Sequence, residues 1–99
     1  MTGHSGPCAG QLWPLPPGEY DWIRMRFAPS TGDGELEDQV WLHYSDGVDP
    51  EWLRRPAGAD ECRIPVTRHA PLVALRLPDR PELYVRDLDL VPAPRREAE

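Results

Sequence analysis

The sequence predicts a small, mostly β protein, and three observations support this. The chain has 99 residues, which suits one small domain with one core. Its 13 prolines exclude long helices almost everywhere, because proline has no amide proton and clashes inside a helix. Five short stretches have the composition or the alternation of strands. We expect a five-stranded SH3-like barrel, which closes its sheet edges, with one short helical turn; a compact β-sandwich is the alternative.

The two ends of the chain are expected to flank this domain. Residues 1–10 are small and polar, which predicts a flexible N-terminal arm. Residues 11–20 contain too many prolines for regular structure, although Leu12, Trp13 and Leu15 are expected to anchor them on the body. Residues 92–99, PAPRREAE, are predicted to form a disordered tail. A single β domain over residues 11–91 remains.

The first two predicted strands are expected to form a hairpin. Residues 20–28 and residues 36–44 each alternate apolar and polar side chains, which is the period of a half-buried strand. The stretch between them, PSTGDGE at residues 29–35, is rich in turn-forming residues. Each strand would bury one face and present the other face to solvent.

The stretch that follows the second strand is predicted to turn a corner through one helical turn. Gly47 is expected to end the strand, because glycine accepts the positive φ that a tight turn often needs. Asp49 is a good N-cap and Pro50 is favoured at the first helical position, so a turn of helix is expected over residues 50–55. Trp52 and Leu53 would then pack inward.

Three more short strands complete the prediction. Residues 62–66, 72–77 and 82–91 are short apolar or alternating runs bounded by turn residues. Pro65 places the first of them at the edge of a sheet, because proline cannot donate a ladder hydrogen bond.

Charge and composition limit the classes of partner. The net charge of −6 disfavours nucleic acid and anionic membranes as partners, since both require a cationic face. All eleven basic residues are arginine, which GC-rich bacterial coding DNA would explain. The sequence has no apolar stretch near 18 residues and no visible signal peptide, so a cytoplasmic location is expected.

The sequence predicts neither a metal nor a cofactor. Cys8 and Cys62 are expected to be free thiols, because no export signal accompanies them. The histidines and cysteines form no Cys-x2-Cys or His-x3-His pair, which strong zinc sites need. The GHSG stretch around Ser5 lacks the second glycine, the strand and the helix of a nucleophile elbow. No catalytic constellation is visible, which favours a protein that is not an enzyme.

The remaining signal is aromatic. The alternation places Trp22 and Trp41 on the polar face of the proposed hairpin, where pairing Ile23 with Val40 sets the two indoles opposite each other. Exposed tryptophan beside arginine is typical of an interaction surface, although residues 11–17 could instead cover the two rings. The predicted binding residues are Tyr20, Trp22, Arg24, Arg26, Trp41 and His43.

Three functions compete on this basis. The first is a small non-catalytic module that binds a protein or peptide through the aromatic and arginine face. The second is a small barrel nuclease of toxin type, in which Arg24, Arg26 and His43 would stabilise a phosphoryl transition state. The third is a carbohydrate- or surface-binding β-sandwich, in which Trp22 and Trp41 would stack on sugar rings. The oligomeric state is left open.

Overall fold

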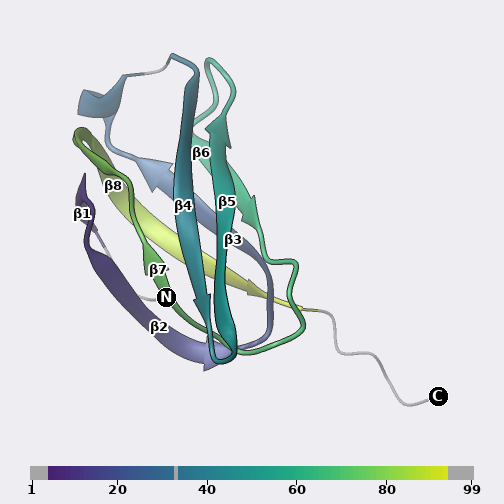
Figure 1. Ribbon diagram of the computed structural model, residues 1–99. Helices are drawn as coiled ribbons and strands as arrows, with labels where there is room; N and C mark the ends of the chain where they lie inside the picture. Colours follow the sequence, from purple (N-terminus) through teal and green to yellow (C-terminus); the bar gives the residue numbers. More distant parts are fainter. Residues whose placement is uncertain (1–4, 33, 94–99) are drawn as a thin grey trace.

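The protein is a two-layer β structure. The computed structural model describes residues 5–32 and 34–93, which form two four-stranded antiparallel sheets facing each other (Figure 1). Sheet A has the strand order β1-β8-β3-β6, and sheet B has the order β2-β7-β4-β5. The strands are β1 (Gly6–Ala9), β2 (Leu12–Gly18), β3 (Tyr20–Phe27), β4 (Leu36–Tyr44), β5 (Gly47–Arg55), β6 (Glu61–Pro65), β7 (Leu72–Arg76) and β8 (Asp79–Pro92).

The sandwich alternative is therefore confirmed, and the closed SH3-like barrel is wrong. Among the described strands, β1 and β6 are the edges of sheet A, and β2 and β5 are the edges of sheet B, so neither sheet closes on itself. Figure 1 shows β5 beside β6, where the two layers meet along one side of the sandwich. The described residues contain no α-helix; their one helical element is a 3-10 turn, η1 (Pro29–Thr31). No described helix has the length and apolarity needed to cross a membrane.

The predicted hairpin between β3 and β4 is wrong. Strand β3 pairs with β6 and β8 in sheet A, whereas β4 pairs with β5 and β7 in sheet B. Trp22 lies opposite Pro65 and Val91, so it does not pair with Trp41. Alternation identified the buried face of each strand correctly. Alternation could not identify the strand that each one pairs with, because the apolar faces of β3 and β4 contribute to the same core from opposite sheets.

The predicted helical turn over residues 50–55 is also wrong. Strand β5 pairs with β4 at every position from Leu36 opposite Arg55 to Tyr44 opposite Gly47. Pro50 is tolerated because β5 lies at the edge of sheet B, where a strand has a neighbour on one side only. The same rule holds for Pro65, since β6 is the other edge of sheet A, as predicted.

The N-terminal region contributes two strands that the proline content concealed. Residues 6–9 belonged to the predicted flexible arm, yet they form β1 and bury Cys8 completely. Residues 12–18 form β2, whose register shifts between Pro14 and Gly18. Because β2 is an edge strand, its prolines do not interrupt a ladder on both sides. Residues 1–4 and 94–99, the outer parts of the predicted arm and tail, lie outside the described residues.

The core lies between the layers and takes one face of every strand. Its fully buried members include Ile23 and Met25 from β3, Val40 and Leu42 from β4, and Leu75 from β7. Trp13 packs at its margin, as predicted. The alternation of each strand then directs the other set of side chains outward, and this fixes the two outer faces that are available for binding.

Arg68, in the loop between β6 and β7, binds two aspartates at the turn of the β4–β5 hairpin, an arrangement that we call the Arg68 clamp. Its guanidinium bonds both carboxylate oxygens of Asp49, at 3.0 and 2.6 Å, and one oxygen of Asp46, at 2.9 Å. It also lies 5.2 Å from the centroid of the Tyr44 ring. These hydrogen bonds raise the pKa of Arg68. Asp49 therefore accepts bonds from a distant loop and does not cap a helix.

Candidate functional site

The six predicted binding residues do not form one surface. Tyr20, Trp22, Arg24 and Arg26 lie on β3 in sheet A, and Trp41 and His43 lie on β4 in sheet B. Trp22, Arg24 and Arg26 alternate with buried side chains on β3, and Trp41 and His43 do so on β4, so these five point away from the core on the outer faces of opposite layers. Tyr20 differs, because it is partly buried and packs against the core.

The arginines on the outer face of sheet A are neutralised by neighbouring carboxylates. Arg24 lies 3.9 Å from Asp89 on β8, and Arg26 lies 3.7 Å from Glu61 on β6. Arg63, also on β6, lies 3.7 Å from the same Glu61. These are cross-strand pairs on a solvated face, and each contributes at most a fraction of a kcal/mol, about 0.2–1 kcal/mol. This face is a ladder of alternating charge.

The outer face of sheet B is different, because apolar and aromatic side chains dominate it. We define the tryptophan face as six outward-pointing residues of this sheet: Leu12, Trp41, His43, Val48, Pro50 and Trp52. Across the sheet, Trp41 lies opposite Pro50 on one side and Arg76 on the other. His43 lies opposite Val48, and Trp52 is two pairs along the ladder from Pro50. The members of the face therefore lie on β2, β4 and β5, and Arg76 on β7 lies between Leu12 and Trp41.

Several members of the tryptophan face are unusually exposed. The exposed fraction is 47% for Trp52, 49% for Val48 and 43% for Leu12. The guanidinium of Arg54 lies 5.7 Å from the centroid of the Trp52 ring, and its Nε lies 3.0 Å from a carboxylate oxygen of Glu37. Trp41 is half-buried among its neighbours. Several exposed large apolar side chains on one face of a small protein are characteristic of an interaction site.

The covering segment considered from the sequence does not lie over the tryptophans. Strand β2, which takes up most of residues 11–17, pairs with β7 as an edge strand of sheet B. It forms the edge of sheet B next to β7 and adds Leu12 to the tryptophan face. Pro14 lies opposite Ala74 in the next row of the same sheet.

Sequence reasoning missed Trp52, Val48 and Leu12 as surface residues, and it wrongly assigned Trp52 and Leu12 to packing, since both are exposed. One signal could have found the first two. Asp46-Gly47 lies between two runs that both contain strand-forming residues, and an Asp-Gly step in that position is a strong hairpin signal. The structure contains this hairpin, with Tyr44 paired to Gly47.

The two cysteine thiols, which are the other potentially reactive groups, lie inside the core. Cys8 and Cys62 are free and buried, and burial raises the pKa of Cys8 to about 11 and that of Cys62 to about 12. Thiols held neutral in this way are poor nucleophiles and poor metal ligands. Within residues 5–32 and 34–93, no three histidine, cysteine, aspartate or glutamate side chains cluster as metal ligands.

Known proteins give no further guidance on this site. No protein-family model matches the chain, and no curated protein matches it significantly. Function must be inferred from the surface itself.

Proposed function

We propose that this protein is a non-catalytic interaction module that binds a protein or peptide partner through the tryptophan face. The observation that carries the proposal is Trp52, a large aromatic side chain that is left 47% exposed on the same face of β5 as Pro50 and the 49% exposed Val48. Tryptophan, tyrosine and arginine are the residues most enriched at binding hot spots. On the tryptophan face, tryptophan and arginine occur next to each other.

The charges around the face indicate the chemistry of the partner. Arg76 lies opposite both Leu12 and Trp41 in the sheet, and its Nη1 donates to the carbonyl oxygen of Gly10 at 3.0 Å. Among the described residues no carboxylate lies within 4.0 Å of it, so its charge is open to a partner's acid. A partner surface with an apolar centre and a carboxylate at its rim would match this arrangement.

The same geometry argues against sugar stacking as the main role. A sugar ring needs a free aromatic face, and the Arg54 guanidinium already lies over the Trp52 ring at 5.7 Å from its centroid. The pair considered from the sequence, Trp22 and Trp41, lies on the outer faces of different sheets and cannot hold one sugar chain.

The geometry also argues against a nuclease. Arg24 and Arg26 lie on the outer face of sheet A, each within 4.0 Å of a carboxylate, whereas His43 lies on the outer face of sheet B. A phosphoryl group can be contacted by these three side chains only if they converge within hydrogen-bond distance of one atom group. Here the core separates them.

The proposal is tested by comparing two exposed aromatic residues. We expect Trp52→Ala to reduce capture of a partner from the source cells about tenfold or more, as loss of a hot spot does. Tyr84→Ala is the matched control, because Tyr84 is 43% exposed but lies on β8 in sheet A. It should leave capture unchanged. Trp41→Ala is expected to act in the same direction as Trp52→Ala.

The measurement is quantitative affinity capture, with the melting temperature of each variant recorded in parallel. Equal capture by wild type and a folded Trp52→Ala variant would show that the tryptophan face is not the binding surface. Retention of wild type on insoluble polysaccharide, lost in Trp52→Ala, would instead support the carbohydrate alternative.

A further inference from the structure

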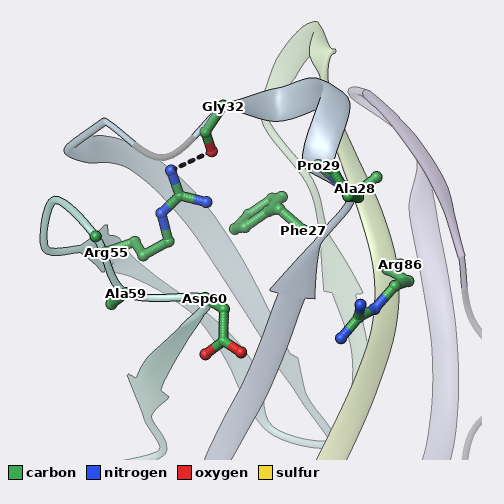
Figure 2. Close-up of a pocket in the computed structure, with 9 residues that line it drawn as sticks. Phe27, Ala28, Pro29, Gly32, Arg55, Ala59, Asp60 and Arg86 are labelled. Carbon is green, nitrogen blue, oxygen red and sulfur yellow. Dashed lines mark hydrogen bonds between the residues drawn. The ribbon is translucent and has the colours of Figure 1, made fainter.

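A pocket of about 460 Å³ opens at one end of the sandwich, away from the tryptophan face. It lies between the segment that carries η1, after β3, and the loop that joins β5 to β6 (Figure 2). Phe27 and Pro29 form an apolar wall. Arg55 and Arg86 contribute positive charge to the lining, and Asp60 contributes negative charge. Its volume falls in the range of roughly 300–1,000 Å³ that small-molecule sites occupy.

Arg55 is the unusual residue of this pocket. It is only 3% exposed, and its Nη2 donates to the carbonyl oxygens of Gly32 at 2.7 Å and Gly34 at 2.6 Å. Its Nε is buried and has no hydrogen-bond partner among residues 5–32 and 34–93. Over the described residues no carboxylate lies within 4.0 Å of this guanidinium, although a buried charge is normally paired.

The buried guanidinium is held in a fixed position at the pocket wall. Its central carbon lies 5.8 Å from the centroid of the Phe27 ring, and Figure 2 shows it held above that ring by the Gly32 carbonyl. A group fixed in this way loses little entropy when it binds an anion. Arg55 is therefore pre-organised as a receptor for negative charge.

A second arginine reaches the pocket through an irregularity in the sheet. On the β3–β8 ladder Arg26 pairs with Asp87, but the next residue, Phe27, pairs with Val85. The register skips Arg86, which is the extra residue of a β-bulge. Bulges redirect side chains and are common next to binding sites. Arg86 lines the pocket, with its Nε 3.5 Å from a carboxylate oxygen of Asp87.

We propose that the pocket binds a small organic monocarboxylate with an apolar body. Arg86 presents an exposed guanidinium group, which suits a planar carboxylate better than lysine would, and the buried Arg55 adds a second positive charge to the wall. The Phe27 ring and Pro29 provide the surface on which the apolar body packs. Asp60 adds one negative charge to the lining, which disfavours multiply charged anions such as phosphate.

The test uses N-acetyl-L-phenylalanine as the probe, titrated into the intact protein and followed by two-dimensional NMR. We expect saturable shifts at the backbone amides of Phe27, Arg55 and Arg86. N-acetyl-L-phenylalanine amide, which lacks the charge, should bind at least about tenfold more weakly. Inorganic phosphate should also bind more weakly than the carboxylate. A tripeptide that ends in phenylalanine, with a free or an amidated carboxyl terminus, distinguishes a peptide end from a free small molecule as the source of the carboxylate.

Two variants locate the binding. Arg86→Gln should raise the Kd of the probe about tenfold without changing the melting temperature, because the Arg86 side chain is 51% exposed. Arg63→Gln is its control, since Arg63 is 58% exposed on the outer face of sheet A and lies outside the pocket lining. The proposal is overturned if the amide binds as tightly as the acid, if the shifts map elsewhere, if Arg86→Gln and Arg63→Gln bind equally, or if no shift occurs at millimolar probe.

Discussion

At the scale of single residues, Gly47 leaves space for the Arg68 side chain and does not adopt a positive φ. Its φ is not positive, contrary to the expectation from the Asp-Gly sequence. A Cβ built on Gly47 would lie 2.5 Å from Nη1 of Arg68, which is too close for any real contact. Glycine therefore leaves room for the guanidinium that bonds Asp46 and Asp49.

We expect Gly47→Ala to displace Arg68 and to lower the melting temperature by a few degrees. The control is Gly34→Ala, because a Cβ there meets nothing within 4 Å and the residue has no positive φ. Combining Gly47→Ala with Arg68→Ala should add little to the loss caused by Arg68→Ala alone, since both changes remove the same clamp. Additive losses in melting temperature would contradict this account.

Adjacent arginines on β5 provide a second prediction at this scale. Arg55→Met should lower the free energy of unfolding by about 1–3 kcal/mol, because the carbonyl groups of Gly32 and Gly34 lose their donor. Arg54→Met should change it by less than about 0.5 kcal/mol, since the Arg54 side chain is 65% exposed and its pair with Glu37 is a surface pair. Urea denaturation of both variants measures the difference. Equal values would mean that the buried guanidinium is not a structural donor.

At the scale of elements, β5 shows why strand geometry matters for the site. In a strand, neighbouring side chains point to opposite faces, so Leu53 is fully buried while Trp52 is 47% exposed. In the predicted helical turn both would have packed inward. The difference decides whether Trp52 belongs to the core or to a binding surface.

This alternation gives a direct test of the element. Leu53→Ala should cost about 2–5 kcal/mol, as emptying a buried aliphatic site usually does. Trp52→Ala should cost less than about 1 kcal/mol, the scale of a solvent-facing cross-strand contact. Thermal and urea unfolding of the two variants provide the comparison. A larger loss for Trp52→Ala than for Leu53→Ala would show that the indole is part of the core.

Five of the eight strands were predictable because each shows a local pattern. The alternation around Ile23 and Leu42 reports burial on one face, and that signal needs no knowledge of the neighbouring strand. Strand β5 was not predicted, because Asp49 and Pro50 also satisfy the rules for a helix start. No local pattern reveals that Arg68 donates hydrogen bonds to Asp49 from a distant loop. The prolines of β2 were read as irregular because an edge position cannot be seen in sequence.

The candidate site was predictable only in part, for a related reason. Trp41 and His43 were placed outward correctly, since the face of a strand follows from its alternation. Their neighbours were not, because these depend on which strands pair. Once β4 pairs with β5, Trp22 is replaced by Trp52 as the aromatic neighbour on the same sheet. The Arg55 pocket depends on two loops and a bulge, none of which has a sequence signature.

At the scale of the whole molecule, the single core holds two thiols that stay protonated well above neutral pH. Cys8 on β1 and Cys62 on β6 lie on the two edge strands of sheet A, and both are among the buried residues of the core. Burial is the main cause that raises the pKa of Cys8 to about 11 and of Cys62 to about 12, from an ordinary value of 9.0. Burial also raises the pKa of Tyr44. These three groups link the stability of the whole fold to alkaline pH.

The direction of that linkage follows from where the protons are held. Below pH 9.0 the thiols are protonated in both the folded and the unfolded chain, so their contribution is complete. Above this value the unfolded chain loses its thiol protons while the folded chain keeps them until about pH 11 for Cys8 and about pH 12 for Cys62. Unfolding then releases protons, so the free energy of unfolding must fall as pH rises through this interval.

We therefore expect urea denaturation curves to show a steady loss of stability from pH 9.0 to about pH 11. A variant with both Cys8→Ala and Cys62→Ala should be less stable at neutral pH, because it leaves small cavities, but its stability should fall less steeply over the same interval. A slope remains from Tyr44, whose pKa is raised in the same direction. Parallel pH profiles for the wild type and the double variant would show that the thiols ionise equally in the folded and unfolded chains, and hence that they do not lie in the core.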